Sequence, residues 1–201
     1  GRECRDVWTV PKGYKLVGMD ASGLELRMLA HYMDDEGYTN EILTGDIHTA
    51  NQLAAGLETR DQAKTFIYAF LYGAGDAKIG SIVGGTAKDG KRLKEKFLAN
   101  TPALGRLRER VGVASGRGYV LGLDGRRVSV RPERAALKTL LQSAGAIVMK
   151  EALKLLYEYA TKLKNDCKII GNIYDEIQSF NVHLLHNRTL STFMGKWMLS
   201  T

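Results

Sequence analysis

The chain has 201 residues, of which 44% are hydrophobic and 25% are charged, a composition typical of a globular protein with one large or two small domains. No apolar stretch approaches the roughly 20 residues of a membrane span, so no membrane partner is expected. The formal net charge of +7 favours a polyanionic partner such as nucleic acid, but it does not distinguish an enzyme from a binding module.

Three early segments have the patterns of regular structure. Residues 14–19 alternate enough to form a strand that ends at Asp20, and the apolar residues of 24–33 have helical spacing. Asp46 follows a glycine and can cap a helix that continues through His48.

The best-defined helix follows. Thr59 and, three residues later, Gln62 form a capping box, which predicts a helix that runs to about Tyr72 and ends at the glycine-containing segment 73–75. The rest of the chain predicts a basic helix at 88–98, a helix from 101 to about 112, a β-hairpin at 119–130, a helix at about 134–162 and two short strands within 168–180. Asp124-Gly125 predicts a type I′ turn in the hairpin. This order indicates an α+β fold rather than a regular β-α-β alternation.

Carboxylates at two predicted strand ends are candidates for metal chemistry. Asp20 ends the first strand, and Asp175 and Glu176 interrupt the apolar strands near the end of the chain. Adjacent carboxylates in apolar surroundings are costly unless a divalent cation offsets their charge, and magnesium favours such oxygen ligands. Taken alone, the acidic pair is more often a turn with solvated acids.

One face of the capped helix has the residues of a phosphate site. Arg60, Lys64 and Tyr68 are spaced four apart, and two cations near a helix N-terminus attract a triphosphate. His48 could also donate to a phosphate, although a lone histidine is more often a surface residue. A different side of the helix has the apolar anchors Phe66, Ile67 and Phe70. A solvated amphipathic face is the alternative for this helix.

Taken in order, these segments resemble the family A DNA polymerases, most closely the replicative polymerases of podovirus-type phages. Residues 20–27 look like the family's motif A, residues 60–75 like motif B and residues 174–176 like motif C. Residues 122–126 and 141–146 match the segments between these motifs. The match covers nearly the whole chain, and three long motifs in the right order are very specific.

The resemblance implies a DNA-directed DNA polymerase, a nucleotidyltransferase that joins deoxynucleotides to a primer on a DNA template with two Mg²⁺ ions during phage DNA replication. Asp20 and Asp175 would bind both metal ions, with the carbonyl of Ala21 as a further ligand, and Glu176 would support them. The partners would be primer-template DNA and dNTPs.

The resemblance also implies the contacts to the nucleotide and the DNA. The triphosphate would be held by His48, Arg60 and Lys64. Tyr68 would pack on the sugar and hydrogen-bond to Glu25, which excludes a ribose 2′-hydroxyl, and Tyr72 would stack near the templating base. The primer-template contacts would come from Arg126, Gln142 and Tyr174. Two positions depart from the family, because Tyr174 stands where a histidine is usual and Lys138 where an asparagine is usual.

The implied domains are a palm at 1–33 with motif A, helical fingers at 34–118 with the motif B helix at 60–72, and a palm continuation at 119–201 with motif C at 174–176. The palm would be an antiparallel sheet that carries the catalytic carboxylates. The sequence after Gln178 matches poorly, so a truncated or divergent C-terminus is expected. Thumb and exonuclease domains are not expected in this chain, and a processivity factor could bind through the missing thumb.

Two alternatives remain. A nucleic-acid-binding remnant without activity would need none of the matched catalytic residues, and an RNA polymerase or reverse transcriptase fits the helix of Arg60 to Tyr68 with Glu25 less well.

Cys4 and Cys167 form no spacing pattern, which favours a reducing setting. The cytoplasm, that of a host bacterium if a phage encodes the chain, is the expected location.

Overall fold

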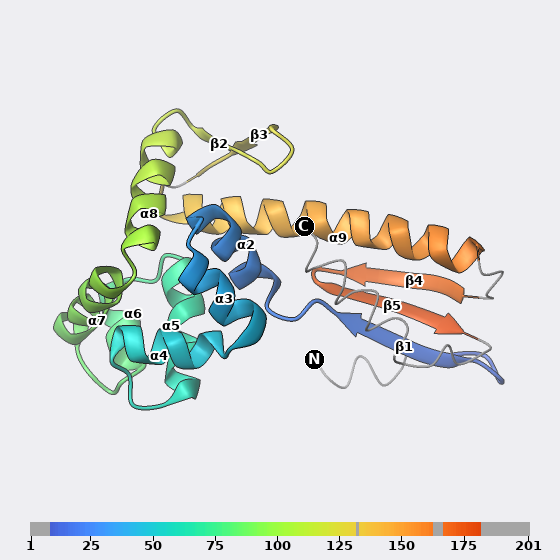
Figure 1. Ribbon diagram of the computed structural model, residues 1–201, viewed down its shortest axis with the longest axis horizontal. Coiled ribbons are helices and arrows are strands. Elements are labelled where there is room, and N and C mark those ends of the chain that lie inside the picture. The colour runs from blue at the N-terminus through green and yellow to red at the C-terminus, as the bar shows by residue number, and fades with distance from the viewer. Residues whose placement is uncertain (1–8, 132, 163–166, 182–201) are drawn as a thin grey trace. The chain divides into compact units, whose positions relative to one another are not determined.

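The structure is a computed structural model that describes residues 9–131, 133–162 and 167–181 (Figure 1). The chain divides into two compact units, which we call the sheet unit, residues 1–24 and 145–201, and the helical unit, residues 25–144. The first unit is built from both ends of the chain. The two units meet after residues 24 and 144, whereas the sequence suggested domain boundaries after residues 33 and 118. The palm and fingers assignment therefore stays a prediction.

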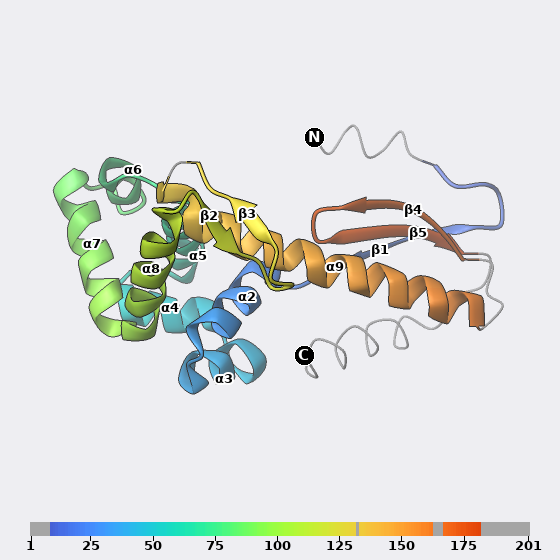
Figure 2. The ribbon, with the colours of Figure 1, turned by 90° about the horizontal axis from the view of Figure 1, so that it is seen from above.

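The sheet unit contains a three-stranded antiparallel sheet in the order β1-β5-β4 (Figure 2). The strands are β1 at Lys15–Asp20, β4 at Cys167–Ile173 and β5 at Glu176–Asn181. The predicted strands are therefore confirmed. In the central strand β5, Ile177 and Ser179 are both buried, and this period of two is typical of a strand with one covered face.

The long helix α9 runs from Ala136 to Lys162, after a short 3-10 turn, η1, at Glu133–Ala135. Its part beyond residue 145 runs alongside the sheet in both views (Figures 1 and 2). That part buries the helical stripe Met149, Ala152, Leu156 and Ala160. The spacing of three to four residues places these side chains on one face, which explains why this segment is a helix that can cover a sheet.

The helical unit contains the other described helices. Their bounds are α2 Leu24–Met33, α3 Glu36–Thr44, α4 Ile47–Ala55, α5 Arg60–Leu71, α6 Asp76–Ser81, α7 Ala87–Asn100 and α8 Pro102–Ser115. The anchors expected on α5, Phe66, Ile67 and Phe70, are all buried. Phe97 of α7 contacts Phe66 and Phe70 edge to face at centroid distances of 5.1 and 5.4 Å, which is a favourable aromatic geometry. This aromatic cluster fixes α5 against α7. None of the described helices has the length and apolar character needed to cross a membrane.

Both predicted helix caps are present. The side chain of Asp46 accepts a hydrogen bond from the backbone N–H of His48 at the start of α4. Thr59 and Gln62 form a reciprocal capping box at the start of α5. Each cap satisfies N–H groups that have no partner within the helix, which is why these local sequences determine where the two helices begin.

The hairpin formed by β2, Tyr119–Leu121, and β3, Arg127–Ser129, is confirmed, but its predicted type I′ turn is wrong. A type I′ turn needs positive φ at both central residues. Only Gly125 has one, of 76°, since Asp124 is not among the described residues with positive φ. The N–H of Gly125 donates to the carbonyl of Gly122 at 3.0 Å, so the turn centres one residue earlier and the left-handed glycine follows it. The loop is longer than a two-residue turn because the strands end at Leu121 and resume at Arg127.

Candidate active site

The antiparallel register brings the three predicted catalytic carboxylates together in the sheet unit. Asp20, the last residue of β1, lies directly opposite Glu176, the first residue of β5. The backbone N–H of Ala21 donates to the carbonyl of Asp175 at 2.9 Å, which ties the end of β1 to the turn between β4 and β5. Residues more than 150 positions apart in the sequence therefore share one end of the sheet.

The charges of these carboxylates affect one another. Burial, followed by the negative charges of Asp175 and Glu176, raises the pKa of Asp20 above its usual value. A divalent cation between the carboxylates would offset this repulsion. In the described part of the chain, no group of three or more His, Cys, Asp or Glu side chains has the arrangement of a metal site. Magnesium needs only one or two carboxylates when substrate phosphates complete its shell, and the residues present fit that kind of site.

Two residues that support Glu176 were missed by the sequence reasoning. The side-chain amide of Gln178 donates a hydrogen bond to the carboxylate of Glu176. Gly18, on the neighbouring strand, leaves the space for this pair, because a Cβ at Gly18 would lie 3.0 Å from the Gln178 amide nitrogen and 3.2 Å from a Glu176 oxygen. A glycine within a strand usually marks such a close approach, and this signal was available in the sequence.

Tyr174 occupies an unusual backbone conformation next to the carboxylates. It is the first residue of the two-residue turn between β4 and β5, its φ is 57°, and 91% of its surface is exposed. A non-glycine residue in the left-handed region costs about 1 kcal/mol or more, and such strain is often found at functional sites. The phenol is exposed at this edge of the sheet, and its predicted contact with a primer stays a prediction.

The helical unit brings together the predicted triphosphate ligands. The rings of His48 and Tyr68 lie with their centroids 6.4 Å apart. Burial, followed by the charge of Arg60, lowers the pKa of His48; Lys64 lowers it further, and Asp46 opposes the shift. The charges of Arg60 and Lys64 therefore act on His48 near the start of α5, where the triphosphate site was predicted.

Asp46 was predicted only as a helix cap, but it also binds Arg60. Arg60 donates through Nε at 2.6 Å and through a terminal nitrogen at 3.1 Å to the two oxygens of Asp46. This bidentate pair holds the pKa of Asp46 well below its usual value. The guanidinium expected to bind the triphosphate therefore has a carboxylate partner in this structure.

Tyr72 hydrogen-bonds to Glu25, the carboxylate that the resemblance paired with Tyr68. The Tyr72 hydroxyl donates to the two Glu25 oxygens at 2.7 and 2.9 Å. Burial and the hydrogen bond to Glu25 raise the pKa of Tyr72. The Gln142 amide also donates to Glu25, at 3.3 Å, and Lys138 places its ammonium 4.8 Å from the centre of the Tyr72 ring. Tyr72 is one helical turn beyond Tyr68 on the same side of the helix, and the predicted bond of Tyr68 to Glu25 stays a prediction.

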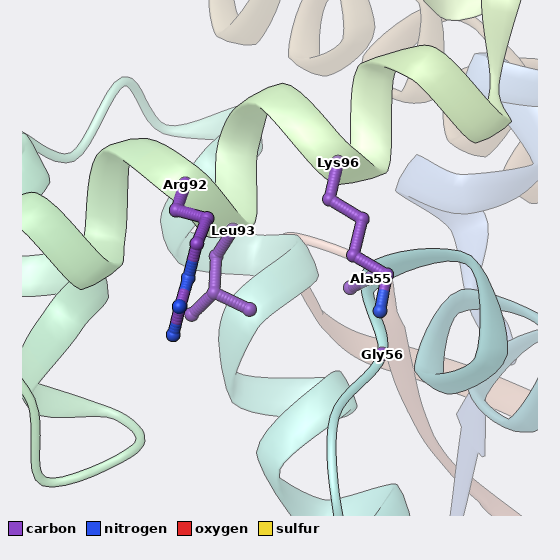
Figure 3. A pocket seen from close by; sticks show the side chains of 5 residues that line it. All are labelled: Ala55, Gly56, Arg92, Leu93 and Lys96. Atoms are coloured by element: carbon purple, nitrogen blue, oxygen red, sulfur yellow. The ribbon is translucent and has the colours of Figure 1, made fainter.

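Two other places in the helical unit complete the description. Arg126 lies in the hairpin loop and forms an ion pair with Asp124 at 3.6 Å, and its predicted contact with DNA stays a prediction. A shallow cavity of about 280 Å³ lies between the end of α4 and helix α7, and Figure 3 shows Lys96 extending from α7 toward Gly56. The cavity is lined by Ala55, Gly56, Arg92, Leu93 and Lys96, none of which is a predicted site residue.

Known proteins resemble this chain in sequence and in fold. A sequence profile described as DNA polymerase family A matches residues 1–200. The "DNA-directed DNA polymerase" of Enterobacteria phage T3 and that of Escherichia phage T7 are each 50% identical over 191 residues, covering 83% of this chain and 27% of the relative. The chain thus spans about a quarter of the length of these relatives.

A solved structure shows the same fold. It is the POL domain of Pol1 from M. smegmatis in complex with DNA primer-template and dNTP, with a TM-score of 0.82, 24% identity, and coverage of 98% of this chain and 39% of that one. The resemblance that the motifs indicated is therefore confirmed. The chain belongs to DNA polymerase family A.

Proposed function

We propose that this chain carries the nucleotide-adding residues of a DNA-directed DNA polymerase, which transfers deoxynucleotides from dNTPs to a primer 3′-hydroxyl on a DNA template in phage DNA replication. Family membership and the activity for which the phage relatives are named support this proposal. The observation that carries it is the pairing of β1 with β5, which places Asp20 opposite Glu176 and joins Ala21 to Asp175.

Polymerases of family A use divalent metal ions. We assign two Mg²⁺ ions to this chain, with Asp20, Asp175 and the carbonyl of Ala21 as their protein ligands. Such ions would lower the pKa of the primer hydroxyl and neutralise the charge of the leaving pyrophosphate. Glu176, held by Gln178, contributes negative charge beside the ligands and keeps their arrangement fixed.

The helical unit supplies the residues that bind the incoming nucleotide. Lys64, Arg60 and His48 neutralise and orient the triphosphate at the start of α5, once Arg60 has exchanged Asp46 for a phosphate oxygen. Tyr68 and Tyr72 offer aromatic faces to the sugar and the base. Glu25, fixed by the Tyr72 hydroxyl, occupies space that a ribose 2′-hydroxyl would need.

Three residues are proposed to contact DNA. Gln142 and Arg126 contact the primer-template, and the exposed phenol of Tyr174 contacts the primer end. Contacts of this kind go to the backbone or to minor-groove acceptors that all base pairs share, so the protein tests pairing shape and does not read sequence.

The metal assignment is tested by Asp175→Asn in the protein. The substitution keeps the size of the side chain but removes a charged ligand, so primer extension should fall by at least about 1,000-fold, since metal ions contribute several kcal/mol of transition-state stabilisation. Primer-template affinity, measured by fluorescence anisotropy, should change by less than about threefold, because phosphate contacts supply most of the affinity for a duplex and Asp175 makes none of them.

The matched control is Glu158→Gln, which removes an exposed charge from α9 in the same unit and should extend primers at the normal rate. Extension by Asp175→Asn near the normal rate would contradict the metal assignment. A wild-type protein that binds DNA but adds no nucleotide would favour the binding-remnant alternative instead.

A further inference from the structure

Lys138 belongs to a network of four side chains in the helical unit. Lys138 and Gln142 are four residues apart on α9 and therefore lie on one face of the helix. The ammonium of Lys138 lies 4.8 Å from the centre of the Tyr72 ring, and the Gln142 amide donates to Glu25. Tyr72 closes the network by donating its hydroxyl to Glu25.

The geometry makes the contacts of Tyr72 mutually supportive. A phenol that donates its proton toward a carboxylate becomes richer in ring electrons, which strengthens the attraction of the ring for a cation above it. The cation of Lys138 is therefore placed where it favours the ring orientation in which Tyr72 binds Glu25. Tyr72 is 44% exposed and ends α5 as its C-cap residue, and its ring also lies beside that of Tyr68, with the centroids 6.4 Å apart.

We propose that Lys138 is a positioning residue that holds Tyr72 in its Glu25-bound orientation and thereby strengthens the exclusion of ribonucleotides. Lys138 acts through Tyr72 and does not touch the sugar. When Tyr72 leaves Glu25, the carboxylate loses its strongest hydrogen bonds and can move out of the space near the sugar 2′ position. The effect on selection rests on the proposed function, whereas the effect on the Tyr72 ring does not.

The decisive variants are Lys138→Met, which keeps an apolar stem without the charge, and Lys138→Arg, which keeps a cation that can stack on the ring. Lys150→Met removes one exposed positive charge from the same helix without touching Tyr72, and it controls for a general loss of charge.

The first measurement reports on the ring itself. In protein with ¹³C-labelled tyrosine, Tyr72→Phe assigns the Tyr72 resonance by its disappearance. Lys138→Met should shift that resonance and broaden it, whereas Lys138→Arg and Lys150→Met should leave it near its wild-type position. An unchanged Tyr72 resonance in Lys138→Met would overturn the positioning role, whatever the activity.

The second measurement is the ratio of kcat/KM for a dNTP to that for the matching rNTP. Lys138→Met should lower this ratio roughly three- to tenfold, the effect of one cation–π contact, while Lys138→Arg restores it to within about twofold. Equal losses in Lys138→Met and Lys138→Arg, or a uniform loss for both substrates together with weaker DNA binding, would show instead that Lys138 only binds the duplex. A wild-type protein that adds neither nucleotide would refute the proposed function, and the NMR result would still decide the contact.

Discussion

At the scale of single residues, Asp46 links two parts of the proposed nucleotide site. Its carboxylate caps α4, the helix that carries His48, and accepts a hydrogen bond from the Thr49 hydroxyl at 2.8 Å. It also binds Arg60 through both oxygens. The hydrogen bonds from Arg60 and then from Thr49 are the main reasons why its pKa is low, so it is ionised across the working pH range. A triphosphate must therefore compete with Asp46 for Arg60.

This competition predicts the effect of Asp46→Asn. Asparagine can still cap α4, but it lacks the charge that holds Arg60, so dNTP affinity should rise roughly two- to fivefold, the range of an exposed ion pair. The measurement is dNTP binding to the protein on a dideoxy-terminated primer-template. Asp61→Asn removes a neighbouring charge that makes no hydrogen bond to Arg60, and it should have little effect. Weaker binding by Asp46→Asn would mean that Asp46 instead holds Arg60 in its binding position.

At the scale of elements, α6 and α7 cross at a pair of glycines. A Cβ on Gly90 of α7 would overlap the carbonyl of Asp76, and one on Gly80 of α6 would overlap the carbonyl of Thr86. Lys94 reinforces the crossing by pairing with Asp76 at 2.8 Å and donating to the carbonyl of Ala74 at 2.7 Å. The atoms that an added Cβ on Gly80 or Gly90 would overlap belong to the backbone, which cannot move aside as a flexible side chain can.

Gly90→Ala should therefore lower the free energy of unfolding by roughly 1–3 kcal/mol, because overpacking outweighs the better helix propensity of alanine. Urea unfolding followed by circular dichroism measures the change. Gly105→Ala in α8 is the matched control, since nothing lies within 4 Å of the added methyl group, and it should raise the free energy of unfolding by up to about 1 kcal/mol. Equal effects of the two substitutions would show that the α6–α7 crossing is not closely packed.

At the scale of the whole molecule, the net charge of +7 predicts that the affinity for the proposed DNA partner depends on salt. Lysine and arginine that neutralise phosphates release counterions, so affinity falls as salt rises. Between 50 and 200 mM salt, the affinity for a primer-template duplex should fall roughly 10- to 100-fold, as about two to four neutralised phosphates imply. Fluorescence anisotropy with two duplexes of unrelated sequence should give the same slope. A flat salt response, or slopes that depend on sequence, would indicate recognition of the bases instead.

Most elements could be predicted from the sequence because their causes are local. The capping box of Thr59 and Gln62 and the cap at Asp46 satisfy backbone groups only a few residues away. The strand that ends at Asp20 and the buried side of α5 follow from residue spacing within single elements. The order of the three motifs identified the family, because motif order is a property of the sequence alone.

The tertiary structure decided which residues meet. Tyr72 and Glu25 are 47 residues apart, and Gln142 and Glu25 are 117 apart, so no local pattern indicated that these side chains bond to Glu25. The ion pair of Arg60 with Asp46 could not be predicted either. Helical spacing shows which side chains share a face of one helix, but not which charged residue of another element contacts that face. The type I′ turn was misassigned because strand pairing, not the Asp124-Gly125 dipeptide, set the length of the loop.

The sequence by itself determined the elements, their caps and the types of residue available for chemistry, because these depend on propensity and spacing over a few positions. Only the tertiary structure decided that Asp20 lies opposite Glu176, that Asp46 holds Arg60 and that Lys138 lies on the ring of Tyr72. Each of these contacts joins separate elements. Its existence depends on register and packing, which the whole fold determines through burial of its core rather than through any one segment.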